Sequence, residues 1–187
     1  MSVSFGLAIK NFVGPAETPD FRRGMAKTDA IMTRLARIAP VLARLAIKQA
    51  TRTAERSPEK FSCQFDKDLS APDLELHRTP AFRQFVREIF LEATRQGPEG
   101  VVHEYRLNAT RWGFPFEEVD FPIQLWQGDA DTIVPPHHAE YLARRLANAT
   151  LTVLPGVGHL HTPARWREFL KAAVATHTSA PPAPHTG

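Results

Sequence analysis

The stretch from Phe121 to His159, FPIQLWQGDADTIVPPHHAEYLARRLANATLTVLPGVGH, decides the fold of this 187-residue chain. It opens with a short apolar run over 122–128 that has the length and composition of a buried strand. Pro135 and Pro136 then suit the first turn of a helix, where the early backbone amides have no partner within the helix. A second apolar run at 151–154 predicts another strand. The stretch therefore predicts a strand, an acidic loop, a helix, a strand and a turn.

Carboxylates and a histidine follow the ends of these two predicted strands. Gly128-Asp129-Ala130-Asp131 comes directly after the first strand, and Pro155-Gly156-Val157-Gly158 leads from the second strand into His159. Parallel strands place both of their carboxyl ends at one edge of the sheet, so the two loops are expected to face each other. A carboxylate that accepts a hydrogen bond from one imidazole nitrogen fixes the tautomer, and the other nitrogen can then take a proton from a nucleophile.

This combination resembles the last third of an α/β-hydrolase, in which the acid of the catalytic triad precedes the histidine in the chain. The resemblance implies that Asp131 is the triad acid and His159 the triad base. Asp129 is a rival for the acid, but Gly-x-x-Asp and the residues that follow favour Asp131. His161 is a rival for the base, but the Gly-x-Gly turn favours His159. The alternatives are an aspartate that only serves loop hydrogen bonds and a histidine that pairs with it without catalytic work.

The nucleophile of such an enzyme should lie in a Gly-x-Ser-x-Gly elbow. No serine of the chain is flanked by that pattern, and no Asp or Cys takes its place in a similar one. The His-Gly motif of an oxyanion-hole loop is missing as well. Cys63 falls in a predicted helix, where a buried inert thiol is favoured over a nucleophile. The sequence therefore predicts an acid and a base without the atom that they would activate, and a chain that is inactive alone.

The predicted fold class is α/β, as a partial α/β-hydrolase fold with the last strands of the parallel sheet and an inserted helical cap. Residues 1–19 supply an N-terminal strand, Val3–Val13, and residues 20–115 form the cap. Residues 116–177 form the core segment with the acid and histidine loops, and 178–187 is a disordered tail. Three predicted strands stand where the resembled fold has about eight, so the sheet should present an unpaired apolar edge. A second copy or a complementary N-terminal half could bind there.

Within the predicted cap, apolar residues recur every three or four positions and give one continuous helix stripe: Ile31, Leu35, Ile38, Leu42 and Leu45. Pro40 interrupts this stripe, which predicts a kink or two helices that meet there. A basic stripe runs beside it, formed by Arg34, Arg37, Arg44 and Lys48. A solvated face is the favoured interpretation of the basic stripe, with an anionic membrane or nucleic acid as the alternative.

Three further patterns concern helices. Ser70-Ala71-Pro72-Asp73 has the form of a capping box at a helix start. The run 82–93 carries a phenylalanine-rich stripe that is expected to be core, with the lining of an apolar substrate pocket as the alternative. A last helix after Thr162-Pro163 is expected to pack against the sheet through residues that include Phe169.

Composition limits the remaining function classes. Hydrophobic residues make up 43% of the chain, no apolar run is long enough to span a bilayer, and no signal-peptide pattern is present. The single cysteine excludes an internal disulfide and fits a reducing cytoplasm. No cofactor, metal or nucleic-acid partner is expected, because His137, His138, His159 and His161 lack zinc-site spacing and no phosphate loop appears.

Three hypotheses follow, from different classes. The chain is a truncated hydrolase acting on a small apolar or ester substrate once completed, or one half of a split hydrolase. Alternatively, it is a non-catalytic module that binds an apolar ligand or a protein on a hydrolase scaffold.

Overall fold

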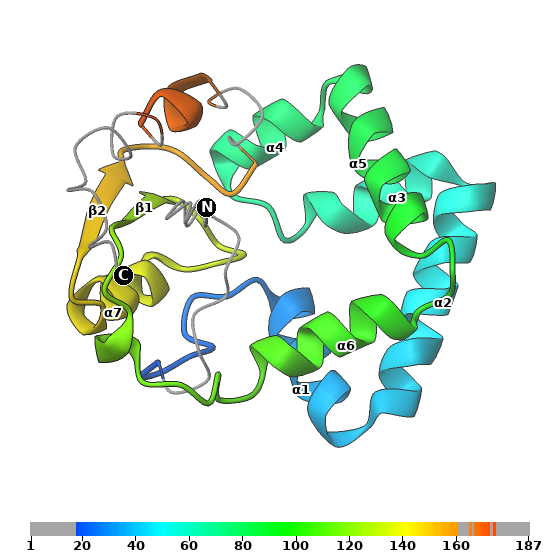
Figure 1. The fold of residues 1–187 in the computed structure, drawn as a ribbon. Coiled ribbons are helices and arrows are strands. Elements are labelled where there is room, and N and C mark those ends of the chain that lie inside the picture. Colours follow the sequence, from blue (N-terminus) through cyan, green and yellow to red (C-terminus); the bar gives the residue numbers. More distant parts are fainter. Residues whose placement is uncertain (1–17, 161–164, 166, 173, 175–187) are drawn as a thin grey trace, which may run out of the picture.

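The computed structural model describes residues 18–160, 165, 167–172 and 174. Helices make up most of this part, with a small sheet at one side of the molecule (Figure 1). The elements before the sheet are α1 (Lys27–Ile38), α2 (Pro40–Arg56), α3 (Pro58–Asp66), α4 (Ala71–His77), α5 (Pro80–Ala93), α6 (Glu99–Asn108) and the short 3-10 helix η1 (Phe116–Glu118). None of the described helices is both long and apolar enough to cross a membrane.

The sheet is the strand–helix–strand unit that the sequence predicts. β1 (Ile123–Gly128) and β2 (Ala149–Leu154) are parallel, and α7 (Pro136–Arg145) connects them. The register pairs Gly128 with Leu154, so the two strands end side by side. Leu125 of β1 and Leu142 of α7 bury their side chains against Phe116 of η1, which closes the face of the sheet under α7.

The last described helical residues also pack on this sheet, as predicted. Residues 165, 167–172 and 174 are helical. Phe169 is fully buried, and its ring centroid lies 5.1 Å from that of Trp126. The predicted strand Val3–Val13, the tail 178–187 and His161 lie outside the described residues, and the limits of the predicted domains stay predictions.

The predicted break at Pro40 is confirmed, since α1 ends at Ile38 and α2 begins at Pro40. The two helices and α6 meet around a cluster formed by Met32, Ala36, Ala43, Ile47 and Val102. Alanine has no side chain beyond Cβ, so helices can approach closely where it faces a neighbour.

Of the apolar stripe predicted across α1 and α2, Leu35 packs against this cluster, but the other four residues do not face it. Ile31, Ile38, Leu42 and Leu45 are each more than half exposed. The buried side of α1 instead carries Met32, Thr33 and Ala36. The break at Pro40 also ends the helical register, so a spacing that continues through it does not describe one face. The interpretation of these residues as one packing stripe is wrong.

The burial predicted for the phenylalanine-rich stripe over 82–93 and for Cys63 is also wrong. No residue of α5 is fully buried, and Phe85 and Ile89 are exposed, while Phe90 contacts Phe61 of α3. Cys63 is exposed on α3. Its neighbours Phe61 and Ser62 take the buried side of that short helix, and Cys63 therefore faces outward.

Candidate active site

Asp131 lies in the loop after β1 and is held by donors on all sides. Its Oδ1 accepts hydrogen bonds from the backbone amides of Ile133 at 3.0 Å and Val134 at 2.8 Å. Its Oδ2 accepts one from Nε2 of Gln127 at 3.3 Å. The side chain has no exposed surface. Because charged carboxylates are buried only when they are well paired, this loop is built to hold one orientation of Asp131.

His159 follows β2 and reaches the same carboxylate. Its Nδ1 donates to Oδ2 of Asp131 at 3.0 Å, and 15% of its side chain is exposed. The two loops approach so closely that a Cβ at Gly128 would overlap the carbonyl oxygen of Val157. Gly156, with φ of 66°, adopts the left-handed conformation that favours glycine and turns the chain towards His159. The predicted meeting of Asp131 and His159 is therefore present.

Asp129, the rival acid, has a different role. Its Oδ1 accepts a hydrogen bond from the amide of Gly156 at 2.7 Å, and its side chain is exposed. Asp129 therefore links the loop after β1 to the turn before His159 at the protein surface. The other rival, His161, is not among the described residues.

Asp73 is a functional candidate that the sequence interpretation missed. The predicted capping box is wrong, because the side chain of Ser70 makes no cap hydrogen bond to the backbone and donates to Oδ2 of Asp73 at 2.9 Å. Asp73 instead accepts the backbone amides of His159 and Leu160, each at 2.7 Å. Only 2% of Asp73 is exposed. A carboxylate from α4 thus fixes the backbone of the histidine turn, and nothing in the local sequence signals a contact across 86 positions.

A cavity of about 910 Å³ opens between the helices and the acid loop. Its wall includes Thr132 and Ile133, which directly follow Asp131, and the apolar side chains of Met32, Phe61 and Phe90. The alternative interpretation of the phenylalanine stripe, as pocket lining, therefore holds for Phe90. Apolar walls with a few polar groups are typical of small-molecule sites.

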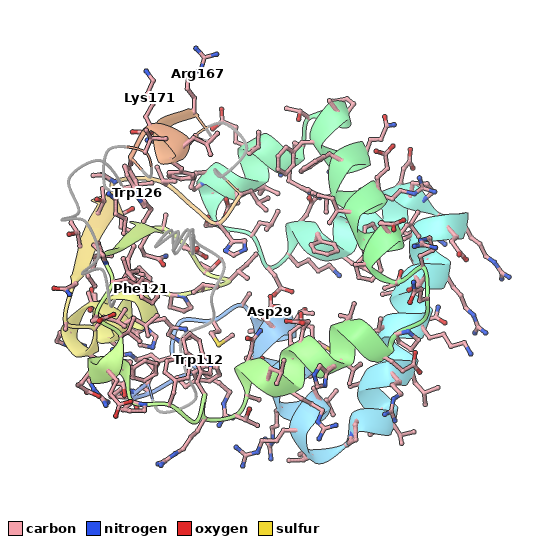
Figure 2. All side chains as sticks on the ribbon, viewed as in Figure 1. Asp29, Trp112, Phe121, Trp126, Arg167 and Lys171 are labelled. Atoms are coloured by element: carbon pink, nitrogen blue, oxygen red, sulfur yellow. The ribbon has the colours of Figure 1, made fainter. Side chains whose placement is uncertain are left out.

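Two of the polar groups of this cavity, Asp29 of α1 and Tyr105 of α6, contact each other. The Tyr105 hydroxyl donates to Oδ1 of Asp29 at 2.8 Å. Figure 2 shows Asp29 near the centre of the molecule, between α6 and the sheet. Burial raises the pKa of Asp29, while the Tyr105 hydrogen bond and the nearby His159 act in the opposite direction. Burial and the adjacent carboxylate raise the pKa of Tyr105 well above its usual value.

The remaining histidines of this region are structural. His138 is completely buried in α7, and its Nε2 donates to the carbonyl oxygen of Phe21 at 2.7 Å. Burial lowers the pKa of His138 to about 4, against the effect of this backbone hydrogen bond. His137 lies beside it, with ring centroids 4.5 Å apart, and burial lowers its pKa as well. Among the described residues no group of three potential ligands could hold a metal ion.

Comparison with known proteins gives the fold. No family model and no curated protein matches the sequence. Solved structures do match: a bromoperoxidase from Bacillus anthracis has 18% identity and a TM-score of 0.52, over 71% of this chain and 48% of its own. An esterase from Exiguobacterium antarcticum has 14% identity and a TM-score of 0.51, over 73% of this chain and 48% of its own.

An α/β-hydrolase enzyme from a Medee basin deep-sea metagenome library, MGS-M2, has 16% identity and a TM-score of 0.51, over 80% of this chain and 55% of its own. The chain thus spans about half the length of the solved structures that it matches. The chain has a partial α/β-hydrolase fold, and this coverage fits the C-terminal portion.

Proposed function

We propose that this chain supplies the acid, the base and the helical cap of an α/β-hydrolase, with Asp131 as the acid and His159 as the base. The observation that carries the proposal is the 3.0 Å hydrogen bond from Nδ1 of His159 to a carboxylate without exposed surface. Asp131 holds the ring with Nδ1 protonated, so Nε2 is the atom that would take the proton of a nucleophile and later return it to the leaving group.

The nucleophile and the oxyanion donors of this hydrolase come from outside the 187 residues. No Gly-x-Ser-x-Gly elbow occurs in the sequence, and the chain matches only about half of its structural neighbours. Without preorganised donors for the oxyanion, the pair alone lacks the largest contribution to acyl transfer. The isolated chain is therefore expected to be inactive.

The substrate is a small apolar molecule, such as an ester with a short acyl or aryl group. The cavity beside the acid loop has mainly apolar walls, and its volume of about 910 Å³ is that of a small-molecule site. Asp29 and Tyr105 are a hydrogen-bonded pair among the polar groups that a bound substrate would meet in this wall.

Nuclear magnetic resonance tests the pair without any turnover. Long-range ¹H–¹⁵N correlation should show His159 with the proton on Nδ1 at neutral pH, and Asp131→Asn should change the ring-nitrogen shifts of His159. Asp129→Asn is the matched control. It removes a carboxylate from the same loop, but that carboxylate binds the amide of Gly156 and not the ring of His159. A His159 spectrum that is the same in both variants would contradict the assignment of Asp131 as the acid.

Hydrolysis of p-nitrophenyl butyrate tests the missing nucleophile. The purified chain should show no turnover above its own His159→Ala variant. Turnover that depends on His159 would show that the chain already holds a nucleophile, and it would leave the assignment of the acid and base intact.

Binding of apolar ligands without catalysis is the second candidate, and the cavity favours it. Titration with a fluorescent naphthalene dye would separate the two. Tight binding that is unaffected by His159→Ala and lost in Phe90→Ala favours a binding module, provided that the resonance experiment finds no Asp131–His159 contact.

A further inference from the structure

The outer surface of α1 and α2 is the feature that the proposed hydrolase does not use. Ile38, Val41, Leu42 and Leu45 surround the corner between the two helices, and each is 55% to 62% exposed. This corner lies at the lower margin of the molecule in Figure 1, away from the sheet. Aliphatic groups gathered at one protruding corner usually mark an interaction site, whereas single exposed ones are ordinary.

Positive charge surrounds this corner without compensation. Between residues 30 and 54 the sequence contains Arg34, Arg37, Arg44, Lys48 and Arg52, and it contains no Asp or Glu. Within the part of the chain that the structure describes, none of these five side chains makes an ion pair. Unpaired cations beside exposed aliphatic groups are the composition of helices that lie on anionic bilayers.

Two of these cations, Arg34 and Arg37, also line a hollow next to the corner. A cavity of about 970 Å³ lies between α1 and the turn before it, and Arg22, Arg23, Arg34 and Arg37 line its wall together with Ile38. Asp20 is the carboxylate in this wall, and it pairs with Arg23 at 3.8 Å. Arginine is the side chain best suited to hold phosphate oxygens.

A polar group without a partner lies in the same wall. Thr18 is only 3% exposed, and its hydroxyl has no hydrogen-bond partner among the described residues. A buried hydroxyl normally has a partner, and the part of the chain that the structure describes supplies none for this one. The hollow therefore combines arginine side chains with a buried hydroxyl that finds no acceptor among the described residues.

We propose that the α1–α2 corner docks on an anionic phospholipid bilayer, with its aliphatic side chains among the headgroups and a lipid phosphate in the arginine hollow. Other occupants fit the surface less well. A symmetric contact with a second copy would bring unpaired cations together, and nucleic acid would leave the four aliphatic side chains in water. The anionic bilayer complements both the charge and the apolar groups.

Co-sedimentation of the full chain with vesicles tests this docking. The chain should bind vesicles of equal parts phosphatidylcholine and phosphatidylglycerol at least about tenfold more tightly than phosphatidylcholine alone, and salt should weaken the binding. This comparison needs no variant, so it decides the question even where a substitution impairs folding. Equal binding to both vesicle types, or none to either, would overturn the proposal.

Two double variants locate the surface. Leu42→Gln with Leu45→Gln should weaken vesicle binding about tenfold, because two apolar groups leave the interface. Arg34→Gln with Arg37→Gln should weaken it about twenty-fivefold, at roughly fivefold for each cation near the membrane. Gln keeps a good helix propensity at these exposed positions, and circular dichroism checks each variant for folding.

Matched pairs elsewhere serve as controls. Phe85→Gln with Ile89→Gln removes two exposed apolar groups from α5, and Arg95→Gln with Arg144→Gln removes two exposed cations. Both controls should change binding by less than about twofold. Equal losses in control and corner variants would overturn the assignment of the surface.

Three further measurements would identify a different binding partner for the α1–α2 corner and the arginine hollow. Calorimetric binding of inorganic phosphate without vesicle binding would make the hollow a site for free anions. Binding of duplex DNA that survives the leucine variant, without vesicle binding, would favour nucleic acid. A dimer that this variant dissociates, without vesicle binding, would favour a second copy. Each of these results would overturn membrane docking.

Discussion

Each of the two regions of the molecule holds an aspartate–histidine pair, and the pairs differ in how they are surrounded. In the sheet region, Nδ1 of His159 lies 3.0 Å from Asp131. In the helical region, Nδ1 of His77 lies 2.8 Å from Asp66, which also accepts a hydrogen bond from Arg83 at 2.9 Å. The contacts are alike, so the contact alone does not identify a catalytic pair.

The two pairs differ in which partner, the histidine or the aspartate, is buried. The His77 side chain is 1% exposed, against 15% for His159, and Nε2 of His77 is buried without a partner in the described residues. Asp66 is 23% exposed, whereas Asp131 has no exposed surface. The sheet region therefore buries the acid and leaves the base within reach, and the helical region buries the base. Only in the first arrangement does the imidazole keep surface that another molecule could reach.

The largest effect is expected from removing the buried acid. Asp131→Ala leaves the donors of Ile133, Val134 and His159 unpaired, and it should lower the free energy of unfolding by about 4 kcal/mol. Asp66→Ala should cost only about 2 kcal/mol, because water reaches Arg83 and replaces part of the interaction. Urea unfolding of both variants gives the difference. Equal costs would mean that the two pairs are supported alike.

The next largest loss of stability is expected at Gly128, where the backbones of the two loops approach closely. Gly128→Ala should lower the free energy of unfolding by about 3 kcal/mol, because the new Cβ overlaps the Val157 carbonyl and neither strand end can move easily. Gly100→Ala in α6 is the matched control, since no atom lies within 4 Å of its Cβ. That control should stabilise the chain by about 0.5 kcal/mol. A neutral Gly128→Ala would refute the tight packing of the two loops.

A somewhat smaller loss of stability is expected from removing the side chain of Asp73, which links the helical region to the sheet region. Asp73→Ala removes the acceptor for the amides of His159 and Leu160 and should lower the free energy of unfolding by about 2 kcal/mol. Hydrogen exchange of these two amides should accelerate in the variant. Glu75→Ala, on the same helix and outside the turn, is the control. Unchanged exchange at both amides would contradict the role of Asp73 in fixing the turn.

The last effect, similar in size to that of Asp73→Ala, concerns acid stability. Because burial lowers the pKa of His138 to about 4, the unfolded chain takes up the proton first as the pH falls below about 6.5. The stability of the folded chain should therefore fall by about 2 kcal/mol between pH 6.5 and pH 4 from this group. His138→Gln keeps an N–H donor for Phe21 and should flatten this slope, whereas exposed His103→Gln should not. Parallel slopes in the two variants would refute this assignment.

The sheet region was largely predictable because its signals are local. Gly128, Asp131 and Pro135 specify the end of a strand, the polar loop and the start of α7 within a few residues. The parallel pairing of β1 and β2 then follows from the helix between them. The choice of Asp131 over Asp129 also followed from its distance from Gly128, and the hydrogen bond to His159 agrees with it.

The helical region was predictable in its helices and not in their faces. Prolines at positions 40, 58 and 80 mark helix starts, and the structure has helices beginning at each. Which side of α1 or α5 is buried depends on the angle at which neighbouring helices cross, and spacing along one helix does not contain that angle. The exposure of Ile38, Leu42 and Cys63 therefore escaped the sequence interpretation.

By itself, the sequence determined the strand–helix–strand unit, the acid and histidine turns at its edge, and the absence of an elbow motif, since each depends on neighbouring residues. Only the tertiary structure decided that Asp73 holds the histidine turn, that Asp29 and Tyr105 share one cavity wall, and that an aliphatic corner faces outward beside arginines without ion pairs among the described residues. These contacts join residues far apart in the chain, and their geometry arises from how whole helices pack.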